Sequence, residues 1–542
     1  MASQFQVDVT GARAAAEIHR TLARLRTASE RAEMLGERYA VHALAFFSLI
    51  YFALSFIHAR IRLLWHDELY TLYLSRIPSA SELYKALLTG ADQHPFAFYR
   101  VTHYSMAALG QNELGLRFPS IVFFWAACAC LFVFVSRRTS RIYGLMAFLF
   151  PMVTLAGAYA IEARGYAGLL FGAALAMVCW DAGARGKRRK AALAGLAFSM
   201  ALASAFHYYA VFLIVPFAAA ELARSLRART LDPPVWAAFA FLYAPVLLAY
   251  PFIRPMRAMS SHFWAAPGWS EALDFFTVTL GPSLPSLVAF ALAIAFLLLF
   301  LPAGARSGAT RPARAESLAA EDVALALGFC AIPFAAMLAA KLVTHAFYFR
   351  YVIEAVLGPV LLACILLYRL MDGRRAAAAA FVLIAGAQFV FGSGIQAILQ
   401  DRATRRGLTA EAAHLASLTP ADLPIAIGDP RTFMQLGYYA SPRLKRRITY
   451  LSDPGRSLKY VDFDTFDAGM DKLRPWFQLN VVEYAAFLRR YNRFLVYTEP
   501  QAAWGWSLLA LLDDGYHPVI LWQNGSRILM RIDPPPASAR SF

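Results

Sequence analysis

The sequence predicts a multi-pass α-helical membrane protein with a C-terminal α/β domain outside the cytoplasm, and three observations carry this prediction. Of the 542 residues, 59% are hydrophobic and only 16% are charged, which is typical of a chain built mainly from membrane spans. Basic residues gather in short clusters between long apolar runs. From about residue 400 the composition changes to that of a soluble domain.

The N-terminal region and the membrane domain differ in how their apolar residues are arranged. Residues 1–39 mix apolar and charged residues without the apolar centre of a cleavable signal peptide, so we expect a cytosolic helical segment there. Within 40–399, apolar runs of roughly 20 residues, long enough to cross a bilayer, recur and predict about eleven spans. The runs are 40–63, 119–136, 143–161, 166–183, 191–207, 209–224, 235–253, 284–302, 322–343, 350–369 and 376–398.

The segment 94–110 is also apolar, and its placement decides the topology of everything after it. It contains Arg100 and His103, and a charge at mid-bilayer costs about 3 kcal/mol. We therefore place it on the membrane surface, within a first extracytoplasmic loop that covers 64–118. The basic clusters then all fall on the cytoplasmic side with the N-terminus, as the positive-inside rule expects. These clusters are 137–141, 187–190, 224–229, 306–314 and 374–375.

The region 400–542 is predicted to be an extracytoplasmic α/β domain. Short β-type runs alternate with helical patterns over 481–491 and 506–512, and Asn524-Gly525 indicates a hairpin between the last two strands. The predicted strands are 425–427, 448–451, 494–497, 519–522 and 528–530. No Gly-rich phosphate loop follows a strand, so we expect this domain to shape or cover a site rather than to bind a nucleotide.

Charge and cysteine content exclude two other classes of function. The net charge of +17 lies in clusters that membrane orientation explains, so it does not require a nucleic-acid partner. All five cysteines lie inside apolar runs without a CxxC pair. The sequence therefore predicts neither a disulfide framework nor a thiol redox site.

The chemically distinctive residues recur in the loops that this topology puts outside the cytoplasm. Adjacent carboxylates, Asp67 and Glu68, directly follow the first apolar run. Four further motifs follow along the chain: His94-Pro95, the stretch 113–120 with Arg117-Phe118-Pro119-Ser120 at the entry to the next run, and the later segments 162–166 and 349–351. Their concentration on one face predicts an active site or binding cleft on that face.

The order of these motifs resembles that of GT-C class membrane glycosyltransferases, especially the protein O-mannosyltransferases and the lipid A aminoarabinose transferases. The likeness covers about residues 40–370, although the usual His-Pro-Pro is His94-Pro95-Phe96 here. The resemblance implies transfer of a sugar from a polyprenyl-phosphate donor to a hydroxyl of a protein, lipid or glycan acceptor, with inversion and with Asp67 as base. The Ala- and Arg-rich composition, without eukaryotic sorting signals, indicates a bacterial inner membrane protein.

The two neighbouring carboxylates are expected to have different roles. Successive residues on a helix point about 100° apart, so Asp67 and Glu68 cannot both face one acceptor hydroxyl. We expect Glu68 to bind a cation or to orient a cationic side chain. Glu162 is the next carboxylate that could reach the site, with a local ion pair to Arg164 as the alternative.

A departing phosphate needs positive charge aimed at it, and a guanidinium can hold two phosphate oxygens. Arg350 is our first choice, because it follows an aromatic cluster suited to a lipid carrier, although an arginine at a span end can equally be a headgroup anchor. The other residues predicted to bind substrate are Lys85, His94, Arg100, Arg164, Tyr166, His345 and Tyr351.

Two further features leave alternatives open. In the long loop 254–282, His262, Trp264 and Trp269 form either an acceptor-binding lid or an interfacial aromatic belt. Histidines at the outer face could hold a divalent metal ion with Glu68 or Glu162, but none has a fixed ligand spacing, so the cofactor stays open.

The rival functional class is a transporter or flippase of lipid-linked sugars. Transporters place ionisable groups near the bilayer midplane and contain repeated halves with broken helices. The sequence has neither pattern, so it favours the transferase.

Overall fold

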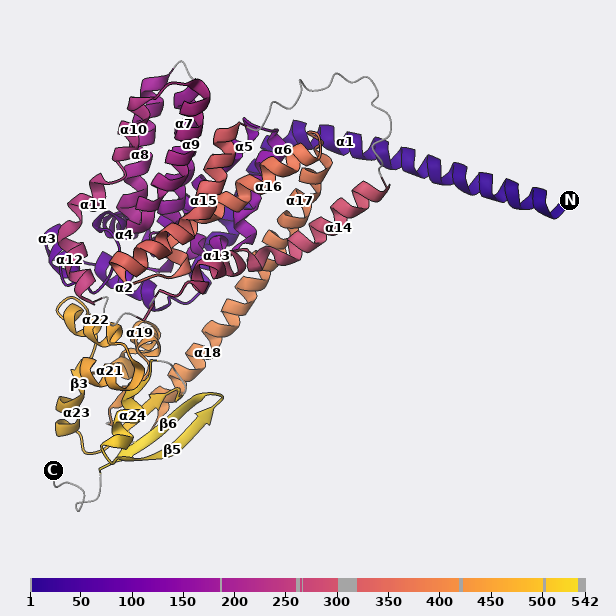
Figure 1. Ribbon diagram of the computed structural model, residues 1–542. Coiled ribbons are helices and arrows are strands. Elements are labelled where there is room, and N and C mark those ends of the chain that lie inside the picture. Colours follow the sequence, from indigo (N-terminus) through magenta and orange to yellow (C-terminus); the bar gives the residue numbers. More distant parts are fainter. Residues whose placement is uncertain are drawn as a thin grey trace.

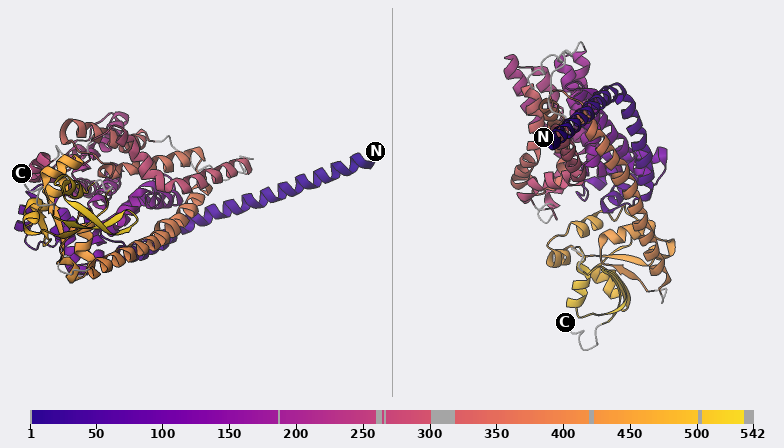
Figure 2. Two further views of the ribbon diagram at one scale, coloured as in Figure 1. Left: turned by 90° about the horizontal axis from the view of Figure 1, so that it is seen from below. Right: turned by 90° about the vertical axis from the view of Figure 1, so that its right-hand side faces the viewer.

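The computed structural model describes residues 2–185, 188–259, 264–265, 267–300, 319–418, 423–500 and 504–534. Within these residues a helical body and a smaller α/β domain stack end to end (Figure 1). The N-terminal part of α1 (Ala2–Ile61) projects away from the helical body (Figure 2). The described chain is therefore a multi-pass membrane protein with a C-terminal sheet domain, as the sequence predicts.

Helices account for the whole membrane body, and most coincide with the predicted apolar runs. Those that follow α1 and cross or line the bilayer are α5 (Glu113–Ser136), α6 (Arg141–Leu149), η1 (Pro151–Val153), η2 (Leu155–Ile161), α7 (Tyr166–Arg185), α8 (Arg189–Phe206), η3 (Tyr208–Leu213), α9 (Ile214–Ala228), α10 (Pro233–Ala240), α11 (Ala244–Leu248), α12 (Tyr250–Met259), α13 (Ser270–Leu280), η5 (Gly281–Ser283), α14 (Leu284–Phe300), α15 (Ala320–Ala339), η6 (Ala340–Thr344), η7 (Phe349–Val356), α16 (Leu357–Leu370), α17 (Ala376–Ala387), η8 (Gln388–Gln396) and α18 (Ala397–Ser417).

Eight stretches of the described chain are long and apolar enough to cross a membrane, and two bent helix pairs raise the number to ten. One bent pair, 141–153 with 155–161, turns by 75°. The predicted run 191–207 corresponds to α8, which packs along α7. The bends matter for the site described next, because the chain after η2 turns back toward the first loop, 64–118.

That first loop is folded into helices. They are α2 (His66–Ser75), α3 (Ala80–Leu87) and α4 (Phe96–Leu109). With 14 residues, α4 is too short to cross a bilayer, which needs roughly 20. It packs against α2, α5 and α8 at the end of the helical body.

The C-terminal domain is a six-stranded sheet with helices around it. Its strands are β1 (Ile425–Ile427), β2 (Ile448–Ser452), β3 (Val481–Glu483), β4 (Phe494–Thr498), β5 (His517–Asn524) and β6 (Arg527–Asp533). Its helices are α19 (Pro430–Tyr439), α20 (Pro442–Lys445), α21 (Pro454–Val461), α22 (Thr465–Leu473), α23 (Tyr484–Arg490) and α24 (Trp506–Asp513).

The sheet has the strand order β3-β2-β1-β4-β6-β5. The first four strands in this order run parallel, while β6 pairs antiparallel with both β4 and β5. Gly525 has a φ of 59° in the β5–β6 turn, which explains the glycine at the predicted hairpin.

One hydrophobic core joins the first loop to the C-terminal domain. Leu69 and Phe98 of the loop belong to the same buried cluster as Ile425 and Tyr450 of the sheet. Hydrogen bonds reinforce this contact, because Gln435 donates through Nε2 to the carbonyl of Leu64 at 3.0 Å. The domain is thus packed onto the end of the helical body.

Candidate active site

The site is organised by the first turn of α2, immediately after the first span. Glu68 occupies the third position of this helix, and the backbone N–H of Trp65 donates to its Oε2 at 3.4 Å. This is one half of a capping box, which fixes the start of the helix. Since neighbouring side chains on a helix diverge by about 100°, Asp67 and Glu68 face different surroundings.

Glu68 is enclosed in a structural ion pair. Arg117 of α5 donates through Nε to Oε1 at 2.7 Å and through Nη2 to Oε2 at 2.6 Å, and both side chains are 0% exposed. The backbone N–H of Ala163 donates to Oε1 at 2.9 Å. Arg117 also donates to three backbone carbonyls around the end of α1. This pair therefore fastens together α1, α2, α5 and the end of η2.

Asp67 faces a cavity of about 690 Å³. The cavity lies where the first loop, the chain after η2, the start of η3 and the start of η7 meet. Among its lining residues are Asp92, His94, Arg164, Tyr166, His207, Tyr209, Arg350 and Tyr351. Half of the residues that the sequence singled out as a site thus come together at one end of the helical body.

An ion pair between Asp67 and Arg350 forms part of the wall of this cavity. Nη2 of Arg350 is 2.8 Å from Oδ2 of Asp67, although the two residues are 283 positions apart. The guanidinium lies over the rings of Trp65, Tyr348 and Trp264, at 5.0, 5.2 and 5.9 Å from their centroids. Arg350 is therefore held by aromatic faces and by one carboxylate, and its Nε makes no hydrogen bond to the described residues.

The charges around Asp67 decide its protonation. Burial alone would raise the pKa of this carboxyl, but Arg350 and then Arg164 outweigh burial and hold it well below its usual range. Asp67 is therefore ionised at neutral pH. Its basicity rises if either cation moves away, because the opposite charge then favours the carboxylate less.

A second ion pair, Asp92 with Arg164, supports the first. Arg164 donates through Nη1 and Nη2 to the two carboxylate oxygens of Asp92, each at 3.2 Å, and through Nη1 to the backbone carbonyl of Asp67 at 3.1 Å. Burial acts to raise the pKa of Asp92, but Arg164 outweighs it and keeps the pKa low. This pair positions the backbone of α2 beneath Asp67.

Gly165 allows the chain after η2 to reach this position. A Cβ on Gly165 would come within 2.1 Å of the carbonyl oxygen of Phe206 and 3.0 Å of the ring of His94. Only a residue without a side chain permits this close approach. The Arg-Gly-Tyr order of the 162–166 motif thus has a packing reason.

Aromatic rings form the floor of the cavity. His94 lies edge-on to Tyr166 and to His207, with ring centroids 5.8 and 5.5 Å apart, and His207 packs against Tyr351. Burial lowers the pKa of His94 to about 4, so its ring is neutral at pH 7. Neither ring nitrogen of His94 has a hydrogen-bond partner among the described residues. This ring can accept a hydrogen bond from a ligand hydroxyl or donate one to it.

Glu162 is buried beside the cavity but does not line it. Its Oε2 lies 3.9 Å from Nη2 of Arg62, while Oε1 has no hydrogen-bond partner in the described chain. Burial raises the pKa of Glu162 to about 7, against the opposing charges of Arg62 and Arg350. The structure pairs this carboxylate with Arg62 rather than with Arg164.

The C-terminal domain covers the cavity with residues that sequence reasoning did not identify. Arg431, Phe466 and Trp504 all line it. The Trp504 ring contacts Trp264 at 6.0 Å between centroids, and the Phe466 ring packs on His66 of α2 at 4.3 Å. Arg431 lies over the Trp504 ring at 5.6 Å. The domain thus contributes an aromatic roof and a cation.

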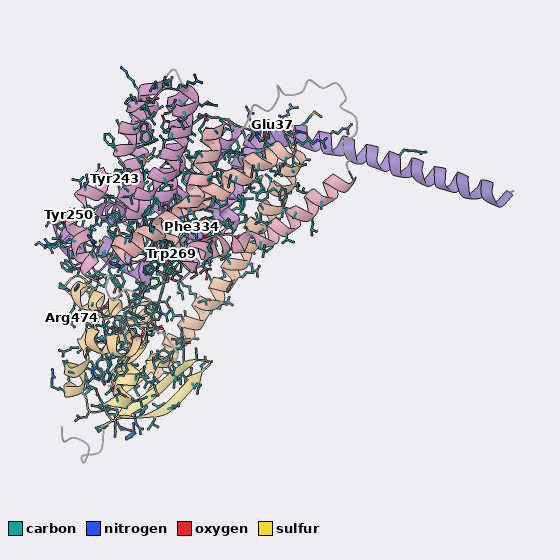
Figure 3. All side chains as sticks on the ribbon, in the orientation of Figure 1. Glu37, Tyr243, Tyr250, Trp269, Phe334 and Arg474 are labelled. Carbon is teal, nitrogen blue, oxygen red and sulfur yellow. The ribbon has the colours of Figure 1, made fainter. Side chains whose placement is uncertain are left out.

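Several predicted site residues lie away from this cavity. Lys85 is 63% exposed and pairs with a glutamate one turn earlier on α3, while Arg100 stacks on a tyrosine one turn later on α4. His345 is exposed at the end of η6, and Trp269, labelled in Figure 3, is 55% exposed at the start of α13. His262 lies outside the described residues.

The residues described here do not form a metal site. In this part of the chain, no group of three or more His, Cys, Asp or Glu side chains could hold a metal ion. The two carboxylates of the cavity are committed to guanidinium groups, Asp67 to Arg350 and Asp92 to Arg164. This donor set suits an anionic ligand better than a cation, and no step below involves a metal.

Comparison with known proteins gives a fold but no sequence family. No known protein family and no curated protein matches the sequence. The structure is similar to ArnT from Cupriavidus metallidurans in the apo state, with 12% identity and a TM-score of 0.56 over 91% of this chain and 98% of ArnT. The match to ArnT bound to undecaprenyl phosphate has 12% identity and a TM-score of 0.55 over 92% and 99% of the two chains.

A weaker likeness connects the chain to the oligosaccharyltransferase of Archaeoglobus fulgidus, at 11% identity and a TM-score of 0.42 over 92% of this chain and 74% of that one. At such identities the likeness concerns the fold. The expectation raised by the motif order is confirmed at this level, and the chain has the GT-C fold of ArnT.

Proposed function

We propose that this protein is a glycosyltransferase that moves a sugar from a polyprenyl-phosphate donor to an acceptor hydroxyl, with inversion at the anomeric carbon and with Asp67 as the base. A single observation carries the proposal. Asp67 and Arg350, far apart in sequence, face each other at 2.8 Å in the wall of the cavity of about 690 Å³. A base and a phosphate-binding cation side by side are what such a displacement requires.

Donor binding is the first step. The donor phosphate enters beside Arg350, whose guanidinium can hold two phosphate oxygens, and the rings of Trp65, Tyr348 and Trp264 contact the sugar or the first isoprene units. Arg350 then shares its charge between phosphate and Asp67. The pKa of Asp67 rises from its depressed value, which makes the carboxylate a better base.

Transfer follows as one displacement. The acceptor oxygen attacks the anomeric carbon and forms the new glycosidic bond, while the bond from that carbon to the phosphate oxygen breaks. The acceptor proton passes to Asp67. The carrier phosphate leaves as an anion that needs no proton, and Arg350 stabilises its charge. Tyr166 and His94 are placed to hydrogen-bond sugar hydroxyls.

In this proposal the membrane body serves to bind the lipid carrier of the sugar donor. ArnT, whose fold the chain shares, binds undecaprenyl phosphate. The basic clusters and the positive-inside rule favour an N-terminus in the cytoplasm and a C-terminal domain on the extracytoplasmic face of a bacterial inner membrane. The acceptor would reach the cavity beneath the roof formed by the C-terminal domain.

The test uses purified protein in nanodiscs with a panel of undecaprenyl-phosphate sugars, and it measures release of undecaprenyl phosphate together with labelled product. We expect turnover with one donor class, and loss of turnover in Asp67→Asn and Arg350→Ala. Asp513→Asn and Arg493→Ala are matched controls, because each removes one partner of an exposed ion pair in the C-terminal domain. Full turnover by Asp67→Asn would refute the base assignment.

A vesicle assay separates the transferase from a transporter. Lipid-linked sugar is supplied on one side, and its movement is followed with no acceptor present. Translocation without covalent transfer would favour the flippase and would contradict the proposed glycosyl transfer.

A further inference from the structure

A second cavity, of about 390 Å³, lies among α1, η1, η2, η5, η8 and α18. It shares no lining residue with the cavity that contains Asp67. Most of its wall is apolar, formed by Tyr51, Leu54, Phe124, Leu155 and Phe389. The proposed transfer reaction does not use this space.

One end of the second cavity is polar. Arg62, His58 and Asp401 line it there. Nε2 of His58 is 2.6 Å from Oδ2 of Asp401, so these two side chains satisfy each other. The guanidinium of Arg62 has only a 3.9 Å contact with Glu162 and no hydrogen bond to a side chain or carbonyl of the described residues. Arg62 therefore retains donors for a ligand.

The surroundings of this polar end are basic. Arg60 is exposed near the end of α1, and Arg402 and Arg406 are exposed on α18, which runs beside it. This charge lies at the extracytoplasmic end of α1, the level at which lipid headgroups meet water. Such a cluster attracts anionic headgroups.

The helices that form the second cavity also carry exposed apolar side chains. Ile57 on α1 is 44% exposed, Leu399 on α18 is 57% exposed and Phe391 on η8 is 66% exposed. None of these three side chains lines the cavity, but all lie on helices that contribute to its wall. These helices therefore present apolar surface to the bilayer next to an apolar chamber.

We propose that this second cavity binds one acyl chain of an anionic phospholipid, with the lipid phosphate at Arg62. A guanidinium can hold two phosphate oxygens, and the apolar wall below it accepts the chain. An apolar chamber with the Arg62 guanidinium at its polar end matches a lipid phosphate with one hydrocarbon chain below it. This lipid is distinct from the donor carrier, whose phosphate belongs at Arg350.

The test measures binding of a phosphatidylglycerol that carries a photoactivatable group on one acyl chain, in nanodiscs otherwise made of phosphatidylcholine. We expect saturable labelling on peptides that contain Tyr51 and Phe389. Arg62→Gln should raise the apparent dissociation constant about tenfold or more, the factor expected for loss of a charged hydrogen bond. Arg38→Gln is the matched control, because it removes the same charge from an exposed side chain on the same helix, away from the cavity lining.

A second variant guards against misfolding of the first. Ala397→Trp adds a bulky ring to the cavity wall, and it should block labelling while Arg62 and its charge remain. Equal binding in Arg62→Gln and Arg38→Gln, or equal labelling by an otherwise identical phosphatidylcholine probe, would overturn the proposal. Displacement of the probe by undecaprenyl phosphate would also overturn it, because the cavity would then belong to the carrier.

Discussion

Asp67 and Glu68 are neighbours in the sequence, yet their ion pairs differ in almost every physical respect. Glu68 and Arg117 are completely buried and accept or donate several hydrogen bonds each. Asp67 and Arg350 pair through one hydrogen bond at the wall of a cavity, and both side chains keep some exposure, 19% and 11%. We call Glu68–Arg117 the closed pair, because it is fully enclosed by protein. We call Asp67–Arg350 the open pair, because a ligand in the cavity can replace one of its partners.

This contrast separates a structural role from a chemical one. A buried pair with all its hydrogen bonds satisfied has no capacity left for a substrate, and breaking it leaves a buried charge uncompensated. A cavity pair can be broken by a ligand that replaces one partner. The predictions below follow from this difference.

The largest effect is expected at the open pair. Asp67→Asn should reduce the rate of sugar transfer by about 10²–10⁴-fold, the usual contribution of a positioned base. Binding of undecaprenyl phosphate should persist, because Arg350 is intact. Single-turnover rates and lipid binding in nanodiscs check both halves. Loss of lipid binding together with transfer would make Asp67 a structural residue.

Breaking the closed pair should reduce the stability of the fold, whereas breaking the open pair should reduce the rate of transfer. Arg117→Ala should lower the free energy of unfolding by about 3–5 kcal/mol, because Glu68 is left charged and unpaired in the interior. Unfolding in mixed micelles measures it. A double variant, Glu68→Leu with Arg117→Met, should recover much of the loss, since apolar replacement of a buried pair is often neutral. No recovery would mean that Arg117 acts mainly through the carbonyls at the end of α1.

A third prediction concerns Glu162, which lies between the two pairs. Its pKa is raised to about 7 from the ordinary 4.5, so the native state binds this proton more tightly than the unfolded state. Stability contributed here is present below pH 4.5 and is lost as pH rises to 7. Glu162→Gln, which imitates the protonated form, should therefore gain up to about 3 kcal/mol relative to the parent at pH 8 and little at pH 4.5. Melting curves at both pH values check it. An equal change at both would contradict the buried environment.

The smallest effect on transfer is expected for Arg431, which lies in the part of the C-terminal domain that covers the cavity. Arg431→Gln should reduce kcat/KM for transfer by roughly tenfold, the loss of about one charged contact to a ligand. Arg474→Gln is the matched control, because this arginine also pairs with a nearby aspartate but is exposed outside the cavity. Equal effects in the two variants would remove the roof from substrate recognition.

Much of the fold was predictable, because long apolar runs in a sequence indicate membrane helices. The eleven runs and five of the six strands correspond to helices and strands of the structure. The missed strand, β3, has three residues, of which only Val481 is buried, so it leaves no clear pattern. The bends after η1 and α11 were also invisible, because they lie within continuous apolar sequence.

The site was predictable only as far as its motifs reach. Asp67, Arg164 and Arg350 belong to motifs that resemble those of GT-C glycosyltransferases. The structure brings all three residues to one cavity. Lys85 and Arg100 were assigned only because they lie in the same loop, and helix α3 and α4 turn them outward. Trp504 could not be found, because its place in the roof depends on how two domains pack.

The long helix α18 affects how the C-terminal domain is rotated relative to the cavity that it covers. Together with α17 and η8 it forms one helical stretch from Ala376 to Ser417, which leads from the last span toward the C-terminal domain (Figure 1). Each residue of an α-helix adds about 100° of rotation and 1.5 Å of rise. Inserting a single alanine in α18 would therefore turn the attachment of the domain by about 100° and oppose the packing of Trp504 and Arg431 over the cavity, whereas a four-residue insertion would leave a net turn of only about 40° and a rise of about 6 Å.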